Sequence, residues 1–157
     1  MHLEYFHLID RIAELNISER TITVEAQVPM ESTIFEGHFP GHPLMPGVLL
    51  IEAMAQTSGW LQIALMKFER MPFLAAVKEA KMRTFVTPGE LLKIDAAIVH
   101  EGSGYTITKA KVRVDGKLKC DATLTFSHAP FPNAALRGYM ETMAKRVGFP
   151  FGAMVNG

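Results

Sequence analysis

Polar and apolar residues alternate along several parts of the chain, and this pattern predicts a sheet. Residues 20–28 place Ile22 and Val24 on one face and polar side chains on the other, which is typical of a half-buried strand. The same argument predicts strands over residues 73–86, 90–100, 105–114 and 117–127. The Asp115–Gly116 pair separates the last two strands and predicts a tight hairpin between them.

Residues 48–66 are apolar on nearly every side and rich in good helix formers. At about 1.5 Å per residue this stretch spans roughly 28 Å, the width of a small domain. A helix that is apolar all round is buried on all sides. Glu52, Gln56 and Gln62 within it argue against a membrane span. We therefore predict the α+β class, with antiparallel strands wrapped around one long central helix.

The C-terminal part of the chain has a different pattern. Leu136, Tyr139, Met143 and Val147 recur at helical spacing, and Gly148 provides a stop. No repeat or linker divides the chain, and 157 residues suit a single domain. We expect one domain over residues 1–128 and a C-terminal helical extension over residues 129–157 packed on it.

Composition and charge narrow the function classes. The chain has 16 basic and 16 acidic residues, and this balance argues against nucleic acid as the main partner. A single cysteine excludes an internal disulfide and fits a reducing compartment. The N-terminal residues lack a basic leader followed by an apolar stretch, so we expect a cytoplasmic protein. Ten methionines and ten phenylalanines fit either an ordinary core or a site for a long apolar ligand.

Candidate chemistry concentrates in the loop over residues 36–47 and the start of the helix. His38 lies among prolines and glycines that restrict the backbone, and a general base needs such positioning. Glu52 is the one charged residue in the apolar helix, and burial can make a carboxylate useful near neutral pH. A carboxylate favoured by the helix dipole is the simpler alternative. The amide of Gly47, at the helix N-terminus, can stabilise negative charge on a carbonyl oxygen. Together these groups suggest acid–base chemistry on an acyl thioester.

A metal site is a weaker interpretation of the same residues. His38, His42 and Glu52 could act as ligands, but a four-residue spacing of histidines helps only on a helix, and Pro40 prevents one. We predict no metal. The remaining histidines have no obvious partners in sequence and are expected at the surface or in packing. Cys120 is expected in the core.

The stretch GHFPGHPLMPGVLLIEAMAQ (residues 37–56) closely resembles a family signature. The signature G-H-F-P-G-x-P-x-x-P-G-V-L-x-x-E-A-M-A-Q marks the beta-hydroxyacyl-[acyl-carrier-protein] dehydratases of fatty acid synthesis, the FabZ/FabA family. FHLIDRIAEL (6–15), AKMRTFVTPGE (80–90) and DGK (115–117) extend the resemblance over about residues 6–127. By this resemblance residues 6–15 form the first strand.

The resemblance implies a hot-dog fold, in which a curved antiparallel sheet wraps one long helix. It also implies a homodimer with two shared active sites, with a hexamer as a further option. His38 then removes a proton from the α-carbon of an (R)-3-hydroxyacyl thioester, and Glu52 of the partner subunit protonates or positions the departing hydroxyl. The Gly47 amide holds the thioester carbonyl. The products are a trans-2-enoyl thioester and water, no cofactor is needed, and Glu at position 52 favours dehydration without isomerisation.

Further roles follow from the same resemblance. The substrate is carried by acyl carrier protein, which is acidic, so a basic surface is expected to receive it. We expect docking by Lys78, Lys81 and Arg83, and a substrate tunnel lined by Phe39, Pro46, Val48, Met54 and Gln56. The tail resembles variants that act on very-long-chain hydroxyacyl groups of lipid A. Its methionine and phenylalanine content leads us to expect that residues 133–157 lie over or beside the tunnel and tune chain length, with simple dimer packing as the alternative. Two alternatives stay open: a hot-dog acyl thioesterase, and a non-catalytic acyl-carrier or lipid-binding module.

Overall fold

A computed structural model describes residues 1–154 of the chain; residues 155–157 of the expected extension lie outside the described residues. The elements in chain order are η1 (Leu3–Tyr5), β1 (Arg11–Asn16), β2 (Thr21–Gln27), α1 (Thr33–Gly37), α2 (Gly47–Leu65), β3 (Arg70–Met82), β4 (Leu91–Gly102), β5 (Tyr105–Val114), β6 (Lys117–Pro130), α3 (Ala134–Arg146) and η2 (Phe151–Met154).

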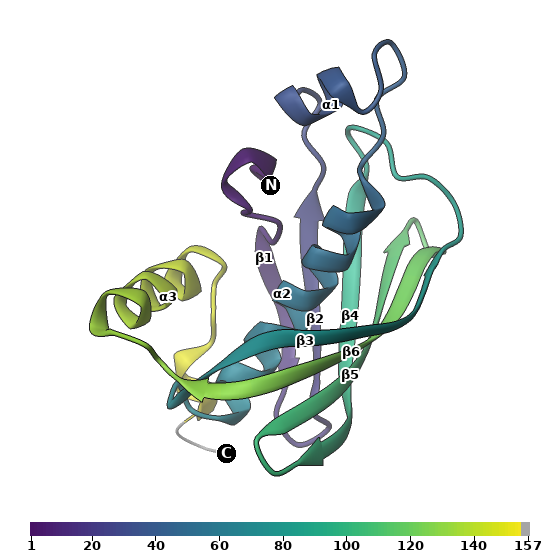
Figure 1. The fold of residues 1–157 in the computed structure, drawn as a ribbon. Helices are drawn as coiled ribbons and strands as arrows, with labels where there is room; N and C mark the ends of the chain where they lie inside the picture. The colour runs from purple at the N-terminus through teal and green to yellow at the C-terminus, as the bar shows by residue number, and fades with distance from the viewer. Residues whose placement is uncertain (155–157) are drawn as a thin grey trace.

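The strands form one antiparallel sheet in the order β1-β2-β4-β5-β6-β3. The sheet curves around α2, which lies in its concave face, while α3 lies to one side of this body (Figure 1). Asp115 and Gly116 both have positive φ, at 48° and 78°, as a tight two-residue hairpin requires. The predicted α+β arrangement, a curved sheet around one long helix, is confirmed.

Helix α2 forms because the residues after Pro46 are nearly all helix formers, and it is stable because the sheet covers it. Ala53, Met54 and Leu61 are fully buried in the core. By length and composition this helix could span a membrane, but 67% of its apolar 18-residue stretch is buried inside the protein. Its apolar character is therefore that of a core helix.

Three predicted elements have different bounds in the structure. The strand expected over residues 73–86 is β3, which begins at Arg70 and ends at Met82. The other two differ for local reasons. Phe6 adopts a left-handed conformation (φ 56°) after η1, so the first strand begins at Arg11 and not at residue 6. The loop predicted over residues 36–47 begins two residues later, at His38, because α1 extends to Gly37. The side chain of Ser32 accepts a hydrogen bond from the amide of Ile34 at 3.1 Å and so caps α1.

Helix α3 begins and ends as its sequence predicts. Asn133 caps its N-terminus by accepting a hydrogen bond from the amide of Leu136 at 2.8 Å. Gly148 follows its C-terminus with a φ of 73°. The amide of Ile12 on β1 then donates to the carbonyl of Val147 at 2.8 Å. This contact joins the C-terminal segment to the outer edge of β1.

Strand β3 forms the other edge of the sheet and is largely exposed. It pairs with β6 on one side, and no strand within residues 1–154 pairs with its other side. Phe73, Leu74, Val77 and Met82 on this strand are each 40–45% exposed. A long apolar edge strand is a template for pairing with another chain. The edge of β3 is therefore open for pairing with a strand of another chain.

A buried polar network joins α2 to the sheet. The Nε2 atom of His128 lies 2.9 Å from Gln62 Oε1 and 2.9 Å from Thr106 Oγ1, and Gln62 Nε2 donates to the carbonyl of Ser58 at 3.1 Å. Gln62 and Thr106 are almost completely buried, so each needs such a partner. Burial, followed by the nearby charge of Arg70, lowers the pKa of His128 below 6.5.

We expect the protein to lose stability as the pH falls through about 6.5. A histidine whose pKa is lower in the folded state binds its proton more readily in the unfolded state, so its contribution is complete above 6.5 and decreases below it. Melting temperatures measured between about pH 7.5 and 5 should therefore fall. His128→Gln should reduce this fall, since glutamine does not titrate; an unchanged pH dependence in the variant would contradict the assignment.

Candidate active site

Two cavities lie on different sides of the start of α2, and they separate the predicted catalytic residues. The larger cavity has a volume of about 430 Å³ and contains Glu52 and Gln56 in its wall. The smaller one has a volume of about 270 Å³ and is lined by His38, Phe39 and Gly47. One chain therefore brings His38 together with Gly47, and it does not bring either of them into the cavity of Glu52.

The loop that carries His38 is fixed by its own backbone hydrogen bonds. The amide of His38 donates to the carbonyl of Ile34 at 3.0 Å, and the amide of Leu44 donates to the carbonyl of His38 at 2.8 Å. Phe39 and His42 exchange two backbone hydrogen bonds at 3.0 and 2.8 Å. The His38 ring stacks on the Phe39 ring with centroids 4.1 Å apart. This framework holds the imidazole in a defined place at the cavity wall.

Gly47 is the first residue of α2, in the wall of the smaller cavity. The first amides of a helix lack partners within the helix and lie at the positive end of its dipole. A Cβ atom at this position would lie 3.4 Å from both Cγ and Sδ of Met82, so a side chain here would crowd the cavity. The site thus offers a backbone donor next to an imidazole.

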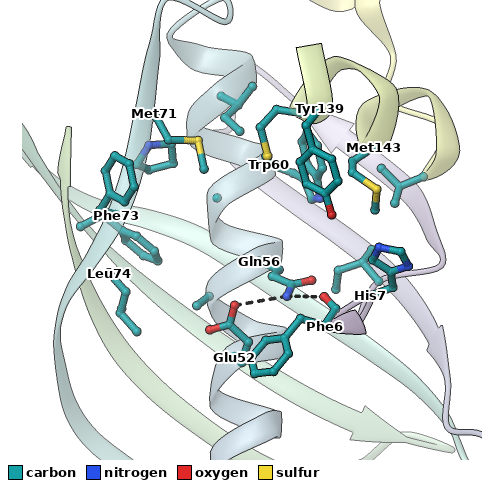
Figure 2. Close-up of a pocket in the computed structure, with 18 of the residues that line it drawn as sticks. Phe6, His7, Glu52, Gln56, Trp60, Met71, Phe73, Leu74, Tyr139 and Met143 are labelled. Atoms are coloured by element: carbon teal, nitrogen blue, oxygen red, sulfur yellow. Dashed lines mark hydrogen bonds between the residues drawn. The ribbon is translucent and has the colours of Figure 1, made fainter. Parts of the chain in front are cut away.

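Glu52 lies in the second turn of α2 and is held by its neighbour one turn later. Nε2 of Gln56 donates to Oε1 of Glu52 at 3.2 Å and to the carbonyl of Phe6 at 2.9 Å (Figure 2). The expectation that Glu52 is buried is not met within one chain: the carboxylate is partly exposed because the cavity opens beside it. Within one chain Glu52 therefore lacks the burial from which its role as an acid or base was predicted.

The larger cavity includes residues that the sequence did not single out. Glu52, Gln56, Trp60 and Ile63 follow one face of α2, and this helical spacing was the available signal for Trp60 and Ile63. The remaining walls come from Tyr5, Phe6, His7, Ile9, Ala55, Gly59, Met71, Pro72, Phe73, Leu74, Phe126, Tyr139, Met140, Met143 and Val147. Tyr139, Met143 and Val147 belong to the C-terminal extension that was expected beside the tunnel, and no local pattern links the others, which are distant in sequence.

His7 ties two of these walls together. Its Nδ1 atom accepts a hydrogen bond from Arg146 Nη1 at 2.7 Å, which joins the N-terminal segment to the end of α3. Burial, followed by the charge of Arg146, lowers the pKa of His7. His7 was expected to be an ordinary surface or packing residue, and it is instead part of the cavity wall.

The other residues expected in the tunnel are not gathered in one place. Phe39 lines the smaller cavity and Gln56 the larger one. Pro46 is buried as the residue before α2, Met54 is fully buried in the core, and Val48 is 72% exposed; none of these three lines either cavity.

The residues expected to receive the carrier all lie on or just after β3. Lys78, Lys81 and Arg83 are exposed, and Arg83 Nε donates to Asp121 at 2.6 Å. Part of this positive charge is therefore neutralised by Asp121. Within residues 1–154, no three histidine, cysteine or acidic side chains lie close enough to hold a metal ion. Cys120 is buried as expected, and burial raises the pKa of its thiol to about 12.

Comparison with protein families decides the relationship. The FabA-like domain model matches residues 1–123, which is most of the chain and includes His38, Gly47 and Glu52. The chain belongs to the FabA-like family.

Relatives within this FabA-like family carry a more specific name. The chain is 40% identical over 119 residues to the 3-hydroxyacyl-[acyl-carrier-protein] dehydratase FabZ of Lactiplantibacillus plantarum, covering 75% of this chain and 80% of the relative. It is 40% identical over 120 residues to the FabZ of Clostridium acetobutylicum, covering 76% and 84%. Helix α3 lies beyond the residues that the family model matches.

Solved structures with the same fold have much lower sequence identity. The conserved protein PA5202 from Pseudomonas aeruginosa matches with a TM-score of 0.63 and 22% identity, covering 80% of this chain and 93% of that one. The thioesterase HI1161 from Haemophilus influenzae matches with a TM-score of 0.60 and 13% identity, covering 78% and 80%. At these identities the likeness concerns the fold alone, and the predicted hot-dog fold is confirmed.

Proposed function

We propose that this protein is a hydro-lyase that converts (R)-3-hydroxyacyl-[acyl-carrier-protein] into trans-2-enoyl-[acyl-carrier-protein] and water in fatty acid synthesis. The observation that carries the proposal is the complete set of His38, Gly47 and Glu52 in a chain 40% identical to FabZ dehydratases. The thioesterase alternative shares the fold, but a fold does not assign an activity. A non-catalytic module would need the apolar cavity without the histidine and the carboxylate.

The proposed reaction requires one base, one acid and one oxyanion donor. The imidazole of His38 removes a proton from the α-carbon, and the amide of Gly47 stabilises the negative charge that develops on the thioester oxygen. The electron pair forms the carbon–carbon double bond as the bond to the 3-hydroxyl breaks. Protonated Glu52 gives its proton to the departing hydroxyl, which leaves as water. A proton then returns from His38 to Glu52, so no external reductant, oxidant or cofactor is consumed.

The separation of His38 and Glu52 supports a shared site in a homodimer. Phe73 and Leu74, near the start of β3, line the cavity of Glu52, while Met82, at its end, lines the cavity of His38. These ends are about 27 Å apart along a strand with a rise of about 3.4 Å per residue. Antiparallel pairing of two β3 strands about their centre would bring the Glu52 cavity of one subunit beside the His38 cavity of the other.

We propose that Lys78 and Lys81, which are exposed on β3, bind the acidic carrier protein. Arg83 contributes less positive charge, because Asp121 neutralises part of it. A cytoplasmic location fits an enzyme that acts on a carrier protein of fatty acid synthesis. A role in lipid A synthesis and assembly into a hexamer stay predictions from the sequence resemblance.

The purified protein is expected to convert hydroxyacyl-carrier substrates into a product lighter by one water molecule. Mass spectrometry of the carrier separates this product from hydrolysis, which releases a free thiol and an acid. We expect dehydration to exceed thiol release by at least about a hundredfold, since only dehydration uses the positioned acid and base. Thiol release from saturated and hydroxylated acyl carriers alike, with no loss of water, would identify a thioesterase instead.

A further inference from the structure

Helix α3 forms one wall of the larger cavity (Figure 2). Tyr139, Met140, Met143 and Val147 from this helix line the space, on the far side from β3. All four lie beyond residues 1–123, where the family model matches. The cavity that contains Glu52 is therefore completed by a segment that the family match does not include.

This wall is held firmly in place. Val147 is bound to β1 through its carbonyl, and Arg146 is bound to His7. Phe149, just after the helix, packs against Trp60 on α2 with ring centroids 5.8 Å apart and against Phe68 at 5.4 Å. Phe149 and Val147 are almost completely buried. The end of α3 is thus part of the packed body of the protein, and the space between α3 and α2 is a fixed feature.

The polarity of the cavity changes along α2. Glu52 and Gln56 provide its polar end, and Gly59, Trp60 and Ile63 continue it as an apolar surface. A Cβ atom on Gly59 would lie 3.9 Å from Pro72 Cγ, so the absence of a side chain leaves room between α2 and β3. A ligand that fits this surface has a polar group at the Glu52 end and an apolar chain that extends along α2 beyond it.

We propose that α3 walls the part of this cavity that receives the distal half of the substrate's acyl chain, and that it sets the accepted chain length. This inference rests on the proposed dehydratase function, in which the 3-hydroxyl lies at Glu52. The eight residues from Glu52 to Trp60 rise by about 12 Å, which an extended chain covers with roughly ten carbon–carbon bonds. The end of a hydroxydodecanoyl chain therefore reaches the level of Trp60, which lines the same cavity as Met143 of α3.

A bulky side chain on the inner face of α3 tests the proposal. Met143→Trp should lower the ratio of kcat/KM for hydroxydodecanoyl over hydroxybutyryl carrier by at least about tenfold, the equivalent of roughly two buried methylenes. Thr142 is exposed on the same helix and lines neither cavity, so Thr142→Trp is the matched control and should leave the ratio unchanged. Met143→Ala should shift the preference toward longer chains. An unchanged ratio in both Met143 variants would overturn the proposal.

Binding can be tested without turnover, because Trp60 is the only tryptophan in the chain. A saturated dodecanoyl pantetheine with bromine on its last carbon should quench the Trp60 fluorescence of the wild type, and bromine next to the thioester should not. Quenching by neither probe would overturn the proposal, as would a change of oligomeric state in Met143→Trp with no change in the length ratio. A wild type that quenches normally but dehydrates no chain length would instead refute the proposed function.

Discussion

Mixing His38→Ala with Glu52→Gln is expected to restore about a quarter of the wild-type dehydratase activity, although each variant alone is nearly inactive. Each single variant should lose about 10²- to 10⁴-fold in kcat, the usual contribution of a positioned acid or base. Neither change removes core packing, because His38 and Glu52 both lie at cavity walls and are partly exposed. Each variant should therefore stay folded and dimeric.

The recovery follows from where the two cavities lie. If each site takes His38 from one subunit and Glu52 from the other, a mixed dimer has one site with both changes and one with neither. Random exchange makes about half of all dimers mixed, and half of their sites are intact, which gives about one quarter. Within one chain His38 and Glu52 line different cavities, and this is the observation behind the expectation.

The measurement is the dehydration rate after subunits have exchanged, with the dimer content followed by light scattering. A mixture of His38→Ala with itself, treated in the same way, controls for the treatment. A mixture that stays as inactive as its components, while exchange is demonstrated by mass, would mean that each chain forms its own site. The proposed arrangement across β3 would then be wrong.

The sequence predicted the central helix well because this element depends on a local pattern, whereas the roles of the site residues stay predictions. The helix over residues 48–66 differs by one residue at each end from α2, since continuous apolar helix formers identify it without knowledge of its partners. The loop of His38 is equally local, as its prolines and glycines restrict the backbone wherever the chain packs.

Tertiary packing decided what the sequence could not. Met54 was expected in the tunnel but is fully buried in the core, whereas Trp60 lines the cavity. Helical spacing groups Trp60 with Glu52 on one face of α2, but which face borders the cavity depends on where β3 and α3 pack. The contact of His7 with Arg146 joins residues 139 positions apart, so His7 was expected to be an ordinary surface or packing residue. The separation of His38 from Glu52 also needs the three-dimensional path of β3.

Val77→Glu is expected to convert the protein into monomers and abolish its dehydratase activity. Val77 lies near the middle of β3, is 40% exposed, and lines neither cavity. In an antiparallel pair of β3 strands the two copies of residue 77 lie close together near the twofold axis. Two carboxylates there would repel each other and would replace apolar contacts with buried charge. Activity should fall by about the 10²- to 10⁴-fold expected for losing one of the two catalytic groups.

Val99→Glu provides the matched control for this experiment. Val99 is 49% exposed on β4, an internal strand of the sheet, so the same change places a carboxylate at a site that β3 pairing does not cover. We expect Val99→Glu to stay dimeric and active, and light scattering with an activity assay measures both properties. A monomeric Val77→Glu that keeps full activity would show that one chain suffices for catalysis. A Val77→Glu variant that stays dimeric and fully active would place the interface elsewhere, because the two new carboxylates would then not repel each other at β3.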